Sequence, residues 1–200
     1  MEENYSGGKV RKGRLFVLAG PSGVGKGTLR KQALSDIENL TYSVSCTTRK
    51  PREGERDGVD YHFVTMRVFE EKIADGLFLE HAVVHGDRYG TLLESVKRET
   101  EAGRDVLLEI DVQGARHVKK IMPDSVLLFI TPPSLEVLEE RLRQRSTESE
   151  AKITLRMKNA KKEMSLSDDF DRVIVNDDLD RTCEELRDVM LSYRNADLNS

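Results

Sequence analysis

Four short apolar runs recur along the chain, and turn residues or charged residues bound each of them. They are RLFVLA at 14–19, VLLEID at 106–111, VLLFIT at 126–131 and RVIVND at 172–177. Runs of this length with little polar alternation are typical of strands that are buried on both faces, as in a parallel sheet. We therefore predict four core strands of one parallel sheet.

Stretches with helical patterns lie between most of these runs. The predicted helices cover 26–35, 112–122, 134–145, 150–166 and 179–193. Strands that alternate with helices along the chain indicate crossover connections between parallel strands. The fold class predicted from the pattern is therefore α/β.

Two segments interrupt this rhythm. Residues 45–91 are dense in glycine, arginine, tyrosine and charge, with two short strand-like pieces, YHFVT and FLEHAVV, which indicates an inserted subdomain. Residues 141–152, RLRQRSTESEAK, are too polar for a core and have the composition of a mobile lid.

Composition limits the classes of protein that fit. A chain of 200 residues suits one compact domain. The net charge of −4 gives no overall basic footprint for nucleic acid. Cys46 and Cys183 are far apart and lack metal-like spacing, which favours reduced thiols in a cytosolic protein. No apolar run approaches a membrane span and the first ten residues lack an apolar signal region, so we expect a soluble, cytoplasmic protein, either monomer or homo-oligomer.

A glycine-rich loop, GPSGVGKGT, follows the first predicted strand. Its backbone N–H groups can converge on one anion, the next helix adds its positive end, and Lys26 adds a charge for the β- and γ-phosphates. The alternative is an ordinary strand-to-helix turn, but the strand before and the helix after favour nucleotide phosphates. The predicted ATP-binding residues of the loop are Gly20, Pro21, Ser22, Gly23, Val24, Gly25, Lys26, Gly27 and Thr28.

The residue after the lysine is Gly27, where the strict phosphate-loop pattern has serine or threonine. No side-chain hydroxyl at that position can hold Mg²⁺. The metal is then held through Thr28, water or a carboxylate elsewhere. Small nucleotide kinases commonly carry this variant, and their second substrate is also a phosphate that needs cationic partners.

Arginines that fit such a phosphate lie in the interrupting segment. Arg49 and Arg52 flank Pro51, which stiffens the loop, and guanidinium groups bind phosphate oxygens in pairs. Tyr61 and Tyr89 can complete the enclosure. Taken alone, the two arginines fit a solvated basic turn equally well.

Asp111 ends the second apolar run, where ligands gather at the carboxyl ends of parallel strands. Its carboxylate can reach Mg²⁺ through water or contact the acceptor nucleotide, and it can also cap the helix that follows. Glu109, two residues earlier, is a weaker candidate. His81 and His85 lack the spacing of a metal motif, so we expect no metal held strongly by protein side chains.

Several ordered motifs together resemble guanylate kinase, which transfers phosphate from ATP to GMP. They run from GRLFVLAGPSGVGKGT through SCTTRKPREGERDGVDYHF, FLEHAVVHGDRYGT and LEIDVQGARHV to RVIVNDDLD. The resemblance implies a phosphate-loop α/β/α core of three layers with a parallel sheet. In that division 45–92 form an inserted GMP-binding subdomain and 138–158 a mobile lid, while 1–44, 93–137 and 159–200 form the core.

The resemblance also assigns residues to the acceptor nucleotide. Glu80 is implied to accept both N1–H and N2–H₂ of guanine, which adenine cannot offer, and without the resemblance it would pass for an exposed strand carboxylate. Ser45 and Thr91 are implied to contact guanine O6 and N2. The implied GMP-binding set is Ser45, Arg49, Arg52, Tyr61, Glu80, Tyr89, Thr91 and Asp111.

On the donor side, the resemblance implies lid arginines that close over the triphosphate. Arg145 and Arg156 are the preferred pair and Arg141 is next, while Asn176 matches a position that contacts adenine. Charge spreads over the equatorial oxygens in phosphoryl transfer, so cations there lower the barrier. The predicted catalytic residues are Lys26, Arg49, Arg145 and Arg156.

The predicted function is transfer of the γ-phosphoryl group of ATP to GMP and to dGMP, with Mg²⁺ accompanying ATP. Two alternatives stay open. One is a kinase of another nucleoside monophosphate, and the other is a non-enzymatic guanylate-kinase-like module that binds proteins.

Overall fold

The computed structural model describes residues 11–84, 86–144 and 150–196. The elements in chain order are β1 (Leu15–Ala19), α1 (Lys26–Asp36), β2 (Leu40–Tyr42), β3 (Cys46–Thr47), β4 (His62–Phe63), α2 (Met66–Ala74), β5 (Phe78–Val84), β6 (Asp87–Leu92), α3 (Leu93–Glu101), β7 (Asp105–Glu109), α4 (Val112–Ile121), β8 (Val126–Thr131), α5 (Leu135–Gln144), α6 (Glu150–Met164), the 3₁₀ helix η1 (Ser167–Asp169), β9 (Arg172–Val175) and α7 (Leu179–Ala196).

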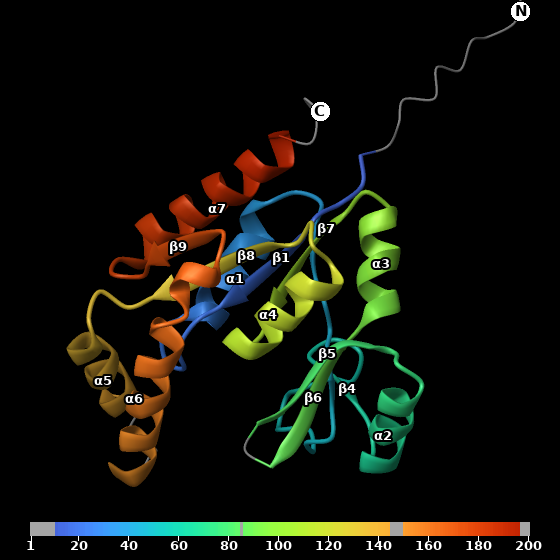
Figure 1. Ribbon diagram of the computed structural model, residues 1–200, viewed down its shortest axis with the longest axis horizontal. Helices are drawn as coiled ribbons and strands as arrows, with labels where there is room; N and C mark the ends of the chain where they lie inside the picture. The colour runs from blue at the N-terminus through green and yellow to red at the C-terminus, as the bar shows by residue number, and fades with distance from the viewer. Residues whose placement is uncertain (1–10, 85, 145–149, 197–200) are drawn as a thin grey trace, which may run out of the picture.

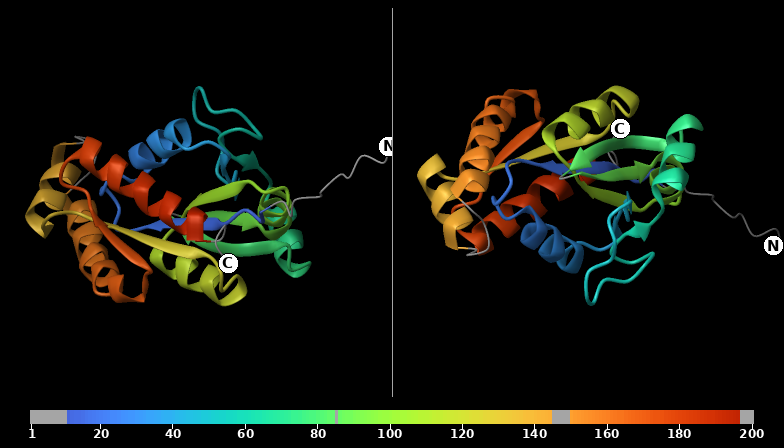
Figure 2. Two further views of the ribbon diagram at one scale, coloured as in Figure 1. Left: turned by 90° about the horizontal axis from the view of Figure 1, so that it is seen from above. Right: turned by 90° about the horizontal axis from the view of Figure 1, so that it is seen from below.

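The core is a five-stranded sheet in the order β2-β7-β1-β8-β9, and all of its pairings are parallel. Alternate residues of β1 enter two separate apolar clusters. Leu15 and Val17 join residues of α3 and α4, whereas Phe16 and Leu18 join residues of α1 and α7. Figure 2 shows these helices on opposite sides of the sheet. The prediction of an α/β fold is confirmed, and β1, β7 and β8 are buried along nearly their whole length. The prediction that the fourth strand is also buried on both faces is wrong, because β9 lies at the edge of the sheet and Val173 and Val175 are exposed.

A second sheet, in the order β4-β3-β6-β5, lies between residues 46 and 92. It stands below the core sheet in Figure 1, on the side away from α5 and α6. Phe69 of α2 stacks on Phe78 of β5 with ring centroids 4.5 Å apart, and Cys46 completes this small cluster. The sheet therefore has an apolar core of its own.

The boundaries differ from the predicted ones in ways that matter for the site. Strand β7 ends at Glu109, so Asp111 lies beyond it as the N-cap of α4. Strand β9 ends at Val175, which leaves Asn176 just outside the sheet. The predicted lid at 141–152 begins and ends in helix, and residues 145–149, Arg145 included, lie outside the described residues.

Candidate functional site

The glycine loop joins β1 to α1, and its backbone needs glycine at two positions for different reasons. Gly25 is the N-cap of α1 with φ of 103°, in the left-handed region that favours glycine. A Cβ at Gly20 would lie 2.1 Å from the carbonyl oxygen of Ile130 in β8. Lys26 Nζ donates to the carbonyl oxygens of Gly20 and Pro21, at 2.6 and 3.1 Å. The lysine side chain thus folds back over the loop.

Asn176, the residue that follows β9, supports this loop. Its side-chain amide is buried and donates to the carbonyl oxygen of Val24 at 2.7 Å. The amide nitrogen is only 2.5 Å from where a Cβ on Gly25 would stand. Asn176 therefore holds the loop in shape, and the adenine contact expected of it stays a prediction.

Helix α6 reaches the same loop through Arg156. Its Nη1 donates to Ser22 Oγ at 2.8 Å, across 134 positions of sequence. One predicted lid arginine is thereby placed at the phosphate loop. Arg141 is half-buried near the end of α5.

Glu80 of β5 lies in a buried polar cluster of the second sheet. Thr91 Oγ1 donates to Glu80 Oε1 at 2.9 Å, and Ser45 Oγ lies 3.4 Å from Thr91 Oγ1. Glu80 is only 5% exposed, which excludes its interpretation as a surface carboxylate. Burial, with a smaller contribution from the charge of Asp111, raises the pKa of Glu80 to about 7.

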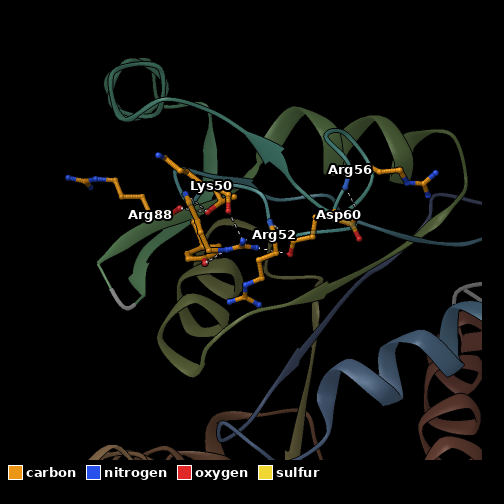
Figure 3. Close-up of polar contacts among 9 residues, drawn as sticks. Lys50, Arg52, Arg56, Asp60 and Arg88 are labelled. Atoms are coloured by element: carbon orange, nitrogen blue, oxygen red, sulfur yellow. Dashed lines mark hydrogen bonds and ion pairs between the residues drawn. The ribbon is translucent and has the colours of Figure 1, made fainter. Parts of the chain in front are cut away.

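Arg49 is the centre of the arginine loop. Its guanidinium donates to both carboxylate oxygens of Glu55, at 2.8 and 3.0 Å, and its Nε donates to Tyr89 Oη at 3.2 Å. Glu55 also accepts the backbone N–H of Arg52 at 2.7 Å. Figure 3 shows Arg52 within this cluster, between Arg56 and Arg88, which project to opposite sides. The side chain of Arg52 itself is exposed.

Aromatic rings line the same loop. The rings of Tyr61 and Tyr89 meet edge to face with centroids 5.8 Å apart. The Arg49 guanidinium lies 5.4 Å from the centroid of Tyr61. Burial raises the pKa of Tyr61, so its hydroxyl stays protonated and can donate a hydrogen bond at neutral pH. The structure thus brings together the side chains of Arg49, Tyr61 and Tyr89, three of the four residues expected to surround a phosphate.

Two carboxylates lie at the carboxyl end of β7, Glu109 as its last residue and Asp111 just beyond it. Asp111 Oδ1 accepts the backbone N–H of Gly114 at 2.7 Å and so caps α4. Glu109 Oε2 lies 3.5 Å from Arg30 Nε and would be 4.0 Å from a Cβ on Gly27. Hard oxygen groups beside the phosphate loop suit a hydrated Mg²⁺. Within the described residues, no group of three or more His, Cys, Asp or Glu side chains could hold a metal by itself.

Three residues at this site were not expected from the sequence. Glu55 orders the arginine loop, and the R-x-x-R-x-x-E spacing was the available signal. Arg30 pairs with Glu109, and its guanidinium carbon is 4.2 Å from the ring centroid of Tyr42. Glu163 is half-buried, and burial raises the pKa of its carboxyl, while the charge of Lys26 lowers that pKa and the charge of Asp111 raises it by smaller amounts.

Comparison with known proteins assigns a family to this arrangement. The chain matches the family model for guanylate kinase over residues 12–193. The chain belongs to the guanylate kinase family. A guanylate kinase of Listeria innocua is 47% identical over 182 residues, covering 90% of this chain and 89% of that protein. A guanylate kinase of Clostridioides difficile is 44% identical over 186 residues, covering 93% and 91%.

A solved structure agrees with these relatives. The crystal structure of guanylate kinase from Anaplasma phagocytophilum matches with a TM-score of 0.74 and 34% identity, covering 91% of this chain and 86% of that one. The resemblance inferred from the sequence motifs is confirmed. In the described part of the chain, no helix combines the length and apolar character that a membrane crossing needs.

Proposed function

We propose that this chain transfers the γ-phosphoryl group of ATP to GMP, and to dGMP as a second acceptor. The donor triphosphate binds to the glycine loop, with Lys26 at the β- and γ-phosphates. Arg156, already in contact with Ser22, meets the same phosphates from α6. Arg141 and Arg145 add charge from the adjoining segment, and Asn176 keeps the loop in shape next to the adenine.

The acceptor nucleotide binds to the second sheet. Arg49, Arg52, Tyr61 and Tyr89 surround its phosphate, since the guanidinium and phenol groups there are donors. Its guanine lies against Glu80, with the Ser45 and Thr91 hydroxyls beside the same edge. Asp111 lies where donor and acceptor meet.

The chemistry needs alignment and charge more than proton transfer. The acceptor oxygen of GMP is already ionised, so no strong general base is required. Arg49, Lys26 and the α6 arginine stabilise the charge that spreads over the transferred group. Mg²⁺, when bound with ATP, neutralises phosphate charge; Thr28 and the Glu109 and Asp111 carboxylates are the residues that would hold its water shell. A cytoplasmic location stays a prediction, based on two free cysteines.

The buried carboxyl of Glu80 is the observation that carries the guanine assignment. Desolvating a carboxylate is costly, so burying one without a cationic partner requires a compensating function. Among the described residues the side chain that donates to this carboxylate is Thr91, which leaves acceptor capacity on the second oxygen. Guanine supplies two adjacent donors, whereas adenine presents an acceptor at N1.

The test is to replace Glu80 by glutamine, which keeps its shape but removes the charge and one acceptor. We expect kcat/KM for GMP to fall at least about tenfold, because a charge-assisted hydrogen bond contributes roughly 1.5–3 kcal/mol. The ratio of kcat/KM for GMP to that for AMP should fall as well, because the amide can donate to adenine N1.

Glu94→Gln is the matched control, because Glu94 is an exposed carboxylate of α3. An unchanged GMP-to-AMP ratio in Glu80→Gln would show that guanine is recognised elsewhere. Assays with AMP, CMP and UMP test the alternative of another nucleoside monophosphate kinase. A chain that binds GMP but turns over none of the four would be a binding module.

A further inference from the structure

Gly114, in the first turn of α4, lies directly against the carboxylate of Glu80. A Cβ on Gly114 would meet Glu80 Oε2 at 3.2 Å, Ile110 Cδ1 at 3.3 Å and Asp111 Oδ1 at 3.4 Å. Contacts this tight require the neighbours to move by a few tenths of an ångström. The absent side chain therefore leaves room for two carboxylates at the start of this helix.

The backbone itself does not call for glycine at this position. Gly114 is not among the glycines with positive φ, and it forms part of a regular helix. Glycine is one of the poorest helix formers, so alanine would favour the helix more. What glycine provides here is space beside Glu80.

The close approach of Gly114 to Glu80 joins the second sheet to a helix of the core. Glu80 belongs to β5 of the second sheet, whereas α4 packs on β1 and β8 of the core sheet. The Asp111 side chain holds the first turn of α4 by accepting the N–H of Gly114 itself. The position of Glu80 is thus set by a core helix whose geometry is fixed at that residue.

We propose that Gly114 is a positioning residue for guanine recognition, because its bare Cα lets α4 approach closely enough to fix where the Glu80 carboxylate stands. The inference rests on the proposed role of Glu80. A methyl group at this position displaces the carboxylate toward the space that guanine occupies. The three atoms nearest to that methyl group belong to Glu80, Ile110 and Asp111 and none to the phosphate loop, so we expect the donor site to be left as it was.

The first experiment compares Gly114→Ala with the wild type and with Gln113→Ala. Gln113 is an exposed residue of the same helical turn, so its replacement controls for helix propensity. A misplacement of 1 Å can reduce a rate about 10²-fold, so a shift of a few tenths should lower kcat/KM for GMP about fivefold in Gly114→Ala. KM for ATP should not change, and the melting temperature should not fall. Unchanged GMP kinetics, or an equal loss on the ATP side, would overturn the proposal.

The second experiment is a double-mutant cycle with Glu80→Asp, whose carboxylate is one methylene further from α4. In that background Gly114→Ala should change kcat/KM for GMP less than twofold, because the contact is gone. A persisting fivefold loss would mean that the methyl acts through Ile110 or the helix. If Gly114→Ala alone fails to fold, recovery of the fold in the double variant supports the contact, and failure of both rejects it.

The role of Glu80 is tested separately. If Glu80→Gln leaves the GMP-to-AMP ratio unchanged, the assignment of guanine to Glu80 fails. If Glu80→Gln lowers that ratio while Gly114→Ala has no effect, only the positioning role of Gly114 fails.

Discussion

Glu80 illustrates how burial alters the chemistry of a single residue. Its pKa is raised from the ordinary 4.5 to about 7, mainly by burial and secondly by the charge of Asp111. The folded protein then holds the proton more tightly than the unfolded chain does. Its contribution to stability is therefore lost as pH rises from 4.5 through 7. When guanine is bound, its two N–H donors stabilise the ionised carboxylate of Glu80.

The kinetics should report this titration. Only ionised Glu80 accepts both guanine donors, so kcat/KM for GMP should fall as pH drops through about 7. For one group of that pKa, the loss between pH 7 and pH 6 is about fivefold. The measurement is a pH profile of kcat/KM for GMP at saturating ATP. The phosphate group of GMP also ionises in a similar pH range. The comparison enzyme is therefore Glu80→Gln, in which the phosphate of GMP still titrates but residue 80 does not. A step near pH 7 of equal size in both enzymes would contradict the assignment.

At this scale the sequence predicted the types of side chain better than their partners. Arg49, Tyr89 and Glu80 were expected at the acceptor site, and they lie in the polar clusters of the second sheet. The hydrogen bond from Asn176 to Val24 joins residues 152 positions apart, so no local pattern could indicate it. Long-range contacts of this kind depend on how strands are ordered in the sheet.

The element that most affects acceptor binding is the loop between β3 and β4. Glu55 accepts two hydrogen bonds from the Arg49 guanidinium and one from the backbone of Arg52. The hydrogen bond from Arg49 lowers the pKa of Glu55, so this carboxylate stays ionised under ordinary conditions. The loop is thereby held in one shape before GMP arrives.

Removal of this carboxylate should weaken GMP binding. In Glu55→Ala the Arg49 guanidinium loses its fixed direction, and the N–H of Arg52 loses its acceptor. We expect KM for GMP to rise roughly several-fold, because the phosphate must then order this solvent-exposed loop as it binds. KM for ATP should stay constant. Glu53→Ala, an exposed glutamate two residues earlier, is the control. Equal GMP kinetics in the two variants would remove Glu55 from the phosphate site.

The elements that the sequence predicted well are those with strong apolar patterns. All four predicted strands and five predicted helices are present, with ends shifted by a few residues. Helices α2 and α3 were not expected, because each has nine residues and few buried positions: Phe69 in α2, and Val96 and Thr100 in α3. Thr65, which accepts the N–H of Val68, was the one local signal for α2. Short polar helices such as these form through packing, which the pattern of one segment does not show.

On the scale of the whole molecule, the candidate site and a buried ion-pair cluster lie at opposite ends of the strands of the core sheet. The carboxyl ends of β1 and β7 carry the phosphate loop and the Glu109 and Asp111 carboxylates, as expected for ligands of parallel sheets. At the opposite end of β7, Asp105 is fully buried. It accepts hydrogen bonds from Arg11 at 2.7 Å, from the N–H of Arg14 at 2.8 Å and from Arg194 at 2.7 Å. This cluster ties the segment before β1 to the end of α7.

Replacement of Asp105 by asparagine should therefore reduce stability without altering catalysis. The change leaves two largely buried guanidinium groups without their counter-charge, and removing one partner of a buried pair costs about 3 kcal/mol. For a chain of this length the melting temperature should fall by about 6–12 °C. Below that transition, kcat and both KM values should equal those of the wild type, because the cluster lies at the far end of β7 from the phosphates. Glu109→Gln provides the opposite comparison: activity should fall, and the melting temperature should change little, since Glu109 is partly exposed. Loss of activity in Asp105→Asn at temperatures where it remains folded would show that the candidate site and the ion-pair cluster are coupled through the sheet.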